Sequence, residues 1–147
     1  KSIIMLSNTC KTAIKAVIYL ASKDESREKA GVKEIAQYIN ASEHTVSKIL
    51  QNLVRQKIIN STKGPTGGFY ITKEQQSQPI ITIVNTIDGK DLFDECGLGL
   101  SKCSSAHPCP IHDDYKKGRE LIQNLFTTKT ISVLCEPVEH GLAHLIG

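Results

Sequence analysis

The sequence predicts an α+β fold that is mainly helical, and three observations support this prediction. Apolar residues recur at helical spacing in several separate stretches of the 147-residue chain. Two short runs of β-forming residues flank a turn that contains Gly and Pro, which indicates one hairpin. Hydrophobic residues make up 39% and charged residues 22% of the chain, a balance typical of soluble globular proteins.

The first predicted helix spans residues 8–22. Its apolar positions recur at helical spacing, and Ser7 or Asn8 can cap its start. Because Asn8, Lys11 and Lys15 interrupt the apolar run, this region predicts neither a secretion signal nor a membrane span. We therefore expect a cytoplasmic protein with no membrane partner.

A helix-turn-helix is predicted next. Two short helical patterns, over residues 32–39 and 42–53, are separated by two residues, and their apolar positions can face each other. Two β-rich runs follow, over residues 57–61 and 68–72, and the turn 63–67 joins them. A helix-turn-helix followed by a hairpin predicts a winged helix.

The rest of the chain predicts two helices on either side of a long loop. Residues 80–87 form a short amphipathic pattern, and residues 113–126 form a longer one. Residues 92–111 between them are rich in Gly, Pro and Cys and show no periodicity. A loop of this length usually has a function.

An apolar stripe on the longer helix predicts a dimer. The stripe consists of Leu121, Ile122, Leu125 and Phe126. Since the winged helix is already a closed unit, we expect this stripe and the apolar residues of 131–134 to pack against a second copy of the chain. The predicted organisation is a winged-helix DNA-binding domain over residues 1–73, followed by a dimerisation arm with a cysteine-rich sensing loop over residues 74–147.

The two predicted regions carry opposite net charge. Residues 1–73 hold 12 Lys or Arg against 5 Asp or Glu, whereas residues 74–147 hold 6 against 10. A basic first region beside an acidic second one indicates that the first region meets a polyanion such as double-stranded DNA.

Candidate DNA contacts lie on the second helix of the helix-turn-helix and on the hairpin. That helix enters the major groove, where its first turns reach base edges. Its candidate residues are Ser42, His44, Thr45, Ser47 and Lys48, with Ser42 also the expected helix cap. In the hairpin, glycines let the backbone approach a phosphate strand. The candidate residues there are Lys63, Thr66, Gly67 and Gly68.

Three of the five cysteines lie in the long loop, close to a histidine. The spacing Cys96-x6-Cys103-x5-Cys109-x2-His112 supplies four ligands for a metal site. Sulfur ligands suit an iron-sulfur cluster, zinc or Cu(I), and an odd cysteine count in a reducing compartment argues against disulfides. Because structural zinc sites usually use closer cysteine pairs, the wide gaps favour a cluster over zinc and over metal-free thiols.

The other donors are interpreted without a metal. Cys10 and Cys135 fall in helical, partly apolar contexts, where a cysteine is usually a small buried hydrophobe. His107 precedes a proline in the loop and is expected at the surface.

The wing Lys63-Gly64-Pro65-Thr66-Gly67-Gly68-Phe69, the helix-turn-helix before it and the triple-cysteine loop after it carry a family resemblance. Together they resemble the IscR/NsrR/CymR-type bacterial winged-helix transcription regulators, over nearly the whole chain. The loop end Cys109-Pro110-Ile111-His112 resembles the iron-sulfur-cluster biogenesis branch, although the first gap is one residue longer here. The resemblance implies a cluster bound by Cys96, Cys103, Cys109 and His112.

The resemblance also indicates the cluster type. In the nitric-oxide-sensing branch an acidic residue on the partner's first helix completes a [4Fe-4S] site, but the matching position here is at about Lys11. The resemblance therefore favours [2Fe-2S] over [4Fe-4S], and it implies repression as the commoner role. We expect that aerobic preparation can remove such a cluster.

The sequence thus predicts a homodimeric transcription regulator that binds an inverted-repeat operator under the control of a cluster sensing redox, nitric oxide or iron-sulfur status. Two alternatives stay open: a cluster-free or zinc-binding winged-helix regulator, and a thiol enzyme with Cys109 as nucleophile and His112 as base. The enzyme would need an orienting third group and a substrate cleft, and the sequence indicates neither.

Overall fold

The structure is a computed structural model that describes residues 6–23, 29–98, 100 and 104–147. The elements are α1 Asn8–Ser22, α2 Val32–Tyr38, α3 Glu43–Arg55, β1 Asn60–Thr62, β2 Gly68–Tyr70, α4 Lys73–Gln76, α5 Ile81–Asp88, the 3-10 helix η1 Lys90–Asp94, α6 His112–Thr128 and α7 Ile131–Glu139. This mainly helical fold with one small sheet confirms the predicted fold class. Among the described residues, no helix has both the length and the apolar character needed to cross a bilayer.

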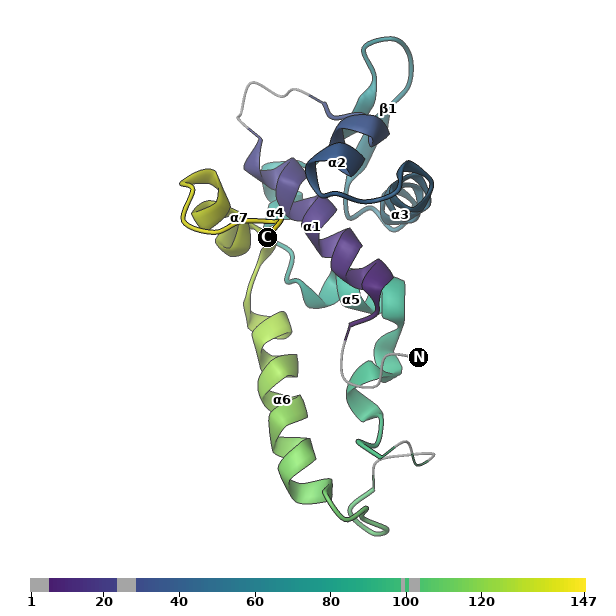
Figure 1. Cartoon of the computed structure of the whole chain (residues 1–147), viewed down its shortest axis with the longest axis vertical. Coiled ribbons are helices and arrows are strands. Elements are labelled where there is room, and N and C mark those ends of the chain that lie inside the picture. The colour runs from purple at the N-terminus through teal and green to yellow at the C-terminus, as the bar shows by residue number, and fades with distance from the viewer. Residues whose placement is uncertain (1–5, 24–28, 99, 101–103) are drawn as a thin grey trace.

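The molecule is elongated, with the hairpin near one end and the connection between η1 and α6 at the other (Figure 1). α1, α2, α3 and the hairpin form the upper part in this view. The long helix α6 extends downward, beside the segment that descends from α5, and contacts η1. The described part of the cysteine-rich connection therefore lies far from the hairpin.

Helix α1 is the centre of the core. Its apolar face is buried and contacts α3, α5 and α7. Ser7 caps the helix by accepting a hydrogen bond from the Cys10 N–H at 3.0 Å. The Ser7 N–H donates to one carboxylate oxygen of Asp88 at 2.8 Å, and its hydroxyl donates to the other. These bonds fix the first turn of α1 to the last residue of α5.

The helix-turn-helix forms from α2 and α3 as predicted. Ile35 of α2 and Val46 and Leu50 of α3 have no exposed surface. The turn includes Asn40 with a φ of 55°, in the left-handed region that Asn tolerates better than most residues. Helix α3 begins just after Ser42, which is its N-cap.

The hairpin is antiparallel and shorter than predicted. β1 begins at Asn60 because the preceding Ile58 and Ile59 are fully buried in the core instead of alternating along a strand. Phe69 of β2 also exchanges two backbone hydrogen bonds with Ala30, with N···O distances of 2.8 and 2.9 Å. The segment before α2 therefore supports the hairpin from its second side.

The buried core continues past residue 73. Side chains of α5 and α7 join those of α1 and α3 in one cluster. The expectation that residues 131–134 pack on a second chain is wrong for Ile131, which is fully buried in its own chain. The cause is a pairing of backbone segments: the Ile131 N–H donates to the Gln78 carbonyl at 3.0 Å, which brings α7 back over the core.

Three helical elements were not predicted: α7 and two shorter ones, α4 and η1. Helix α4 is only four residues long and begins at a capping box formed by Thr72 and Gln75. The 3-10 helix η1 follows α5 directly, after Gly89 has ended α5 with a φ of 85°. Such short helices contain too few residues to show a periodic pattern.

Candidate nucleic-acid interface and cysteine-rich site

The start of α3 presents the predicted polar side chains. Ser42 accepts a hydrogen bond from the Thr45 N–H at 3.4 Å, so its capping role is confirmed. His44 and Lys48 are exposed, while Thr45 and Ser47 are half-buried. Because the opposite face of α3 is buried in the core, His44 and Lys48 point away from the core, and Thr45 and Ser47 lie at the edges of the exposed face.

The wing tip is a tight, exposed turn. The Gly67 N–H donates to the Gly64 carbonyl at 2.9 Å and closes the turn. A Cβ on Gly67 would lie 2.3 Å from a backbone oxygen of β1, and one on Gly68 would crowd the segment before α2. The two glycines therefore set the shape of the wing, whereas the exposed Lys63 and Thr66 offer side chains to a partner.

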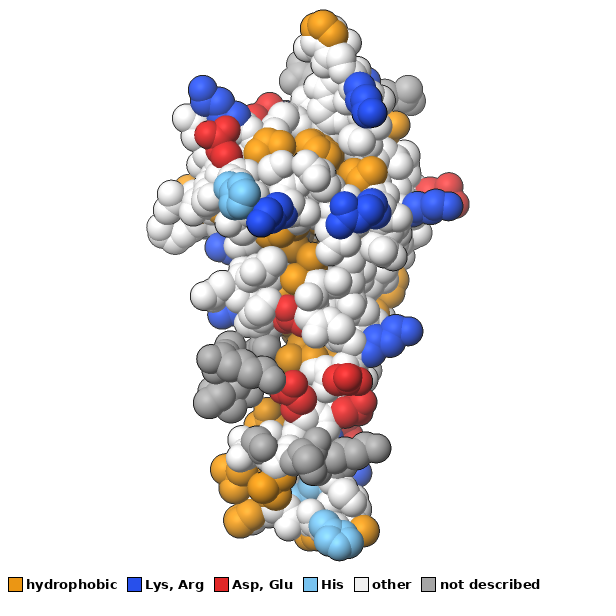
Figure 2. Space-filling view, turned by 90° about the vertical axis from the view of Figure 1, so that its right-hand side faces the viewer, with side chains coloured by type: hydrophobic (Ala, Val, Ile, Leu, Met, Phe, Trp, Pro, Cys, Tyr) orange, Lys and Arg blue, Asp and Glu red, His pale blue; other side chains and the backbone are white. Residues whose placement is uncertain are grey.

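Basic side chains gather around this surface. Figure 2 shows a row of Lys and Arg across the upper half of one face, with a His beside it, and a group of acidic side chains lower down. The exposed basic residues of α2, α3 and the hairpin region are Lys33, Lys48, Arg55, Lys57 and Lys63. On this face the row of basic side chains lies toward the hairpin end, and the acidic group lies nearer the other end.

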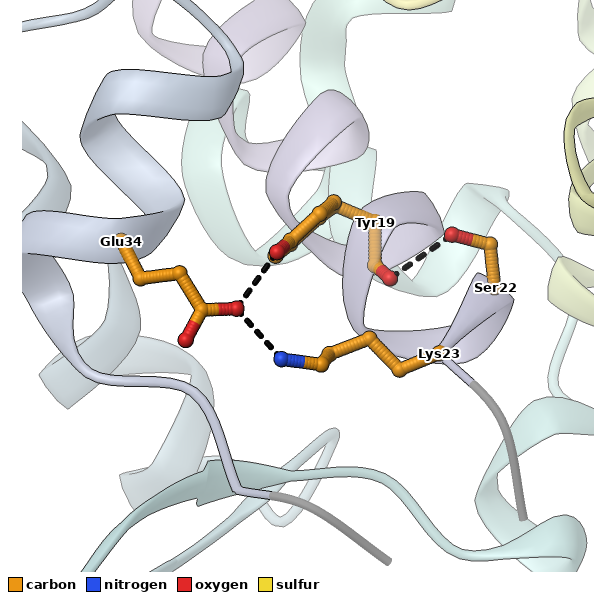
Figure 3. A network of polar contacts seen from close by, with 4 residues as sticks. All are labelled: Tyr19, Ser22, Lys23 and Glu34. Carbon is orange, nitrogen blue, oxygen red and sulfur yellow. Dashed lines mark hydrogen bonds and ion pairs between the residues drawn. The ribbon is translucent and has the colours of Figure 1, made fainter. Parts of the chain in front are cut away.

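A polar network joins α1 to the helix-turn-helix (Figure 3). The Glu34 carboxylate of α2 accepts hydrogen bonds from the Tyr19 hydroxyl and from the Lys23 ammonium group at the end of α1. The ring of Tyr19 also lies 4.3 Å from that of Tyr38, centroid to centroid. No sequence pattern indicated this network, because Glu34 is 15 residues from Tyr19 and 11 residues from Lys23.

The network changes two acidities. Burial alone would raise the pKa of Glu34, but hydrogen bonds from Lys23 and Tyr19 and the charge of Lys23 outweigh it, so the pKa is lowered. Burial, together with the hydrogen bond to Glu34, raises the pKa of the Tyr19 hydroxyl.

The cysteine-rich site lies where the long connection meets the first turn of α6. Cys96, Cys109 and His112 are 7%, 8% and 6% exposed. The His112 N–H donates to the Cys109 carbonyl at 3.0 Å, and its Nε2 lies 3.4 Å from the Ser105 hydroxyl. Cys103 lies outside the described residues.

One face of α6 holds the segment that contains Cys96. His112, Tyr115 and Arg119 share this face because they are three and seven residues apart. The Arg119 guanidinium donates to the Glu95 carbonyl at 2.8 Å, and Gly97 packs so closely on the Tyr115 ring that a Cβ there would lie 2.6 Å from it. Their helical spacing from His112 was the signal that could have singled out Tyr115 and Arg119.

The donor set fits a metal centre in its chemistry and burial. Two buried thiols and a buried imidazole are ligand types that iron-sulfur clusters and zinc use. Within the described ranges, however, no three His, Cys, Asp or Glu residues lie close enough together to hold an ion by themselves. The set is therefore a candidate that includes a fourth residue, Cys103, which the structure does not describe.

The two other cysteines are part of the core, as expected. Cys10 and Cys135 are 0% and 3% exposed. Burial, with a contribution from Asp88, raises the pKa of Cys10 to about 12, and burial, with a contribution from Glu139, raises that of Cys135 to about 11. Such thiols are poor nucleophiles and poor ligands at neutral pH.

The predicted apolar stripe of α6 divides into two faces. Ile122 and Phe126 pack against the chain's own core, and the Phe126 ring lies 6.2 Å from that of Phe93. Leu121 and Leu125 are 72% and 45% exposed. These two leucines remain available to another chain.

A comparison with known families decides the identity of this arrangement. The profile of the Rrf2 family, described as an iron-dependent transcriptional regulator, matches residues 6–137. The chain belongs to the Rrf2 family. The match spans both the winged helix and the cysteine-rich region, and it confirms the resemblance that the sequence indicated.

Individual relatives agree with this assignment. The Rrf2 protein is 29% identical over 140 residues to a predicted HTH-type transcriptional regulator of Aquifex aeolicus (strain VF5), which covers 94% of this chain and 96% of the relative. It is 30% identical over 102 residues to the HTH-type transcriptional regulator NsrR of Geobacillus kaustophilus (strain HTA426), covering 69% of this chain and 64% of the relative. Its fold is similar to that of CymR, the global cysteine regulator of B. subtilis, with a TM-score of 0.73 at 18% identity over 89% of this chain and 95% of CymR.

The family description and the names of these relatives are those of transcription regulators. The Rrf2 protein is accordingly a DNA-binding transcription regulator with a winged helix-turn-helix.

Proposed function

We propose that this Rrf2 protein is a homodimeric, cytoplasmic repressor whose operator binding is controlled by an iron-sulfur cluster held by Cys96, Cys103, Cys109 and His112. The observation that carries the proposal is the burial of Cys96, which follows η1, and of Cys109 and His112 at the start of α6. The same helix exposes two leucines farther along its length. A ligand site and a candidate subunit contact therefore share one rigid element.

The DNA-binding roles follow from the exposed surface. His44, Thr45, Ser47 and Lys48 project from α3 toward the major groove and contact base edges or phosphates. Ser42 leaves the N–H groups of the first turn directed at a phosphate. The wing lies along the neighbouring strand, with Thr66, Gly67 and Gly68 close to the backbone and Lys63 near a phosphate or in the minor groove.

The dimer uses the outer face of α6. Leu121 and Leu125 belong to a patch that packs against the same patch of a second copy, as a two-fold interface requires. Two α3 helices then meet successive major grooves about 34 Å apart, so the operator is an inverted repeat. Ile122 and Phe126 contribute indirectly, because their contacts with the core of their own chain fix the rotation of α6.

The proposed cluster is of the [2Fe-2S] type. When bound, such a group supplies a redox centre that oxidants, nitric oxide or iron shortage can alter. Cys96, Cys103 and Cys109 provide thiolates, and His112 provides a neutral imidazole from the first residue of α6. The description of the family as iron-dependent supports iron over zinc.

One alternative keeps an observation in its favour. A metal-free regulator agrees with the absence, in the part of the chain that the structure describes, of three donors close enough to hold an ion, whereas a zinc site would need such donors just as a cluster does. The thiol enzyme loses its support, because the relatives are regulators of transcription.

Metal analysis of protein purified without air separates these functions. We expect iron and acid-labile sulfide in equal amounts, visible absorption, and a dimer in sedimentation that selects inverted repeats from random DNA. Zinc in place of iron, or no metal and no visible absorption, would favour the alternative. A monomer that selects no DNA sequence would contradict the proposed function itself.

A further inference from the structure

The segment before the long connection is fastened along one face of α6 at three points. The Phe93 ring meets the Phe126 ring, the Glu95 carbonyl accepts from Arg119, and Gly97 packs on Tyr115. Residues 93, 95 and 97 thus pair with residues of α6 in reverse order along the helix. The last two contacts lie on either side of Cys96.

The middle contact involves a buried cation. Arg119 is 9% exposed, which is unusual for Arg unless hydrogen bonds or aromatic contacts compensate for lost hydration. Its guanidinium donates to the carbonyl of the peptide group that joins Glu95 to Cys96, and it lies 6.0 Å from the centroid of the Tyr115 ring. A positive charge is therefore held one residue from a candidate thiolate ligand.

The third contact depends on shape. A Cβ at Gly97 would lie 2.6 Å from the Tyr115 ring and 2.7 Å from the ring carbon nearest the backbone, which rotation of the ring cannot easily relieve. Only Gly lets the backbone after Cys96 approach α6 this closely. Tyr115 and Arg119 thus contact the chain on both sides of Cys96. Both lie on the face of α6 that also carries His112.

We propose that Tyr115 and Arg119 are positioning residues that set Cys96 against His112, and that the Arg119 charge raises the reduction potential of the cluster. The proposal rests on the proposed cluster site. The physical reasons are separate: two contacts fix the first thiolate relative to the imidazole before a cluster binds, and a buried cation favours the more negative, reduced state.

Charge and geometry can be tested with three substitutions. Arg119→Gln removes the charge and keeps a donor, Arg119→Lys keeps the charge and loses the planar fork, and Lys117→Gln removes an exposed charge from the same helix as a control. We expect a lower midpoint potential for Arg119→Gln, a potential near the wild-type value for Arg119→Lys, and no change for Lys117→Gln. Loss of the cluster to a chelator should be roughly tenfold faster or more in Arg119→Gln.

The close contact between Gly97 and Tyr115 can be tested by a double-mutant cycle. Gly97→Ala should speed cluster loss because its methyl group displaces the segment from Tyr115. Tyr115→Ala removes the obstacle, so adding Gly97→Ala to Tyr115→Ala should have a much smaller effect than Gly97→Ala alone. Equal effects in the two backgrounds would refute the contact.

A readout on metal-free protein keeps the two proposals distinguishable. Alkylation of Cys96, followed by mass spectrometry, should be several-fold faster in Arg119→Gln and Tyr115→Ala than in the wild type or Lys117→Gln, at unchanged melting temperature of the winged-helix core. If the wild type holds no iron but alkylation follows this pattern, the cluster proposal fails. The proposal that Tyr115 and Arg119 position the segment around Cys96 is then still supported. If Arg119→Gln matches Lys117→Gln in potential, cluster loss and alkylation, the positioning role is refuted.

Discussion

At the scale of single residues, different residues of the wing set its backbone shape and its charge. Gly64, with a φ of 100°, and Gly67, which has no room for a Cβ, determine the turn. Lys63 beside them is exposed and contributes a cation instead of a shape. A substitution at Lys63 should therefore change DNA binding without changing the fold.

Lys63→Ala should weaken binding to every DNA sequence and reduce the slope of log affinity against log salt by about one, because one phosphate fewer releases its counterions. Fluorescence anisotropy over a range of salt concentrations measures this slope. Lys117→Ala on α6 is the matched control, since it removes an equal charge far from the wing. An unchanged slope for Lys63→Ala would remove this residue from the phosphate contacts.

The Tyr19, Lys23 and Glu34 network gives a prediction about pH. Since the pKa of Glu34 in the folded protein lies below its ordinary value of 4.5, its ionised form stabilises the fold above that value. This stability is lost as the pH falls through the lowered pKa. Glu34→Gln should therefore lower the melting temperature at neutral pH, and the difference from the wild type should shrink in acid.

The control for this prediction is Lys23→Met, which removes the partner and leaves the carboxylate. In the Lys23→Met background, Glu34→Gln should lower the melting temperature less at neutral pH, because the ion pair that it breaks is already absent. A difference between Glu34→Gln and the wild type that stays constant from neutral to acid pH would contradict the assignment.

At the scale of elements, α6 is the part that connects the site to the proposed dimer. Its inner face carries His112, Tyr115, Arg119, Ile122 and Phe126, and its outer face exposes Leu121 and Leu125. Movement of the inner face must therefore also move the outer one.

Leu125→Glu should give monomers with weak operator binding, since the new charge would be buried in an apolar contact. Gln123→Glu adds the same charge to the other side of α6 and should leave the dimer intact. Analytical ultracentrifugation at several concentrations separates the two results. A normal dimer for Leu125→Glu would place the interface elsewhere.

The sequence predicted the elements whose information is local. α1, the helix-turn-helix, α5 and α6 carry periodic apolar residues, and the wing carries a Gly and Pro turn, so their places were evident. Ile131 was misplaced because an apolar residue looks the same whether it meets its own chain or another. Glu34 was missed because its role depends on contacts with distant residues, which no short pattern encodes. Arg119 has a local signal in its helical spacing from His112, but the contact with Glu95 that gives it a role joins distant residues.

At the scale of the whole molecule, one core links the cysteine-rich end to the DNA-binding end. α1 contacts both α3, which would enter the major groove, and α5, which leads to η1 and Cys96. Ser7 and Asp88 fix α1 to α5 at their ends. A structural change at the proposed cluster site would therefore reach the proposed operator surface through two routes: the proposed subunit contact of α6 and the shared core.

The most direct test of this account compares the operator affinity of three samples. The first is an anaerobic preparation with its cluster, and the second is the same preparation after the cluster has been removed. The third is a variant with Cys96, Cys103 and Cys109 all replaced by Ala. We predict that the first protein contains iron and sulfide and differs clearly in affinity from the second. The variant should bind like the cluster-free protein and keep a folded winged helix. Equal affinities in all three, with no iron in the wild type, would contradict the account.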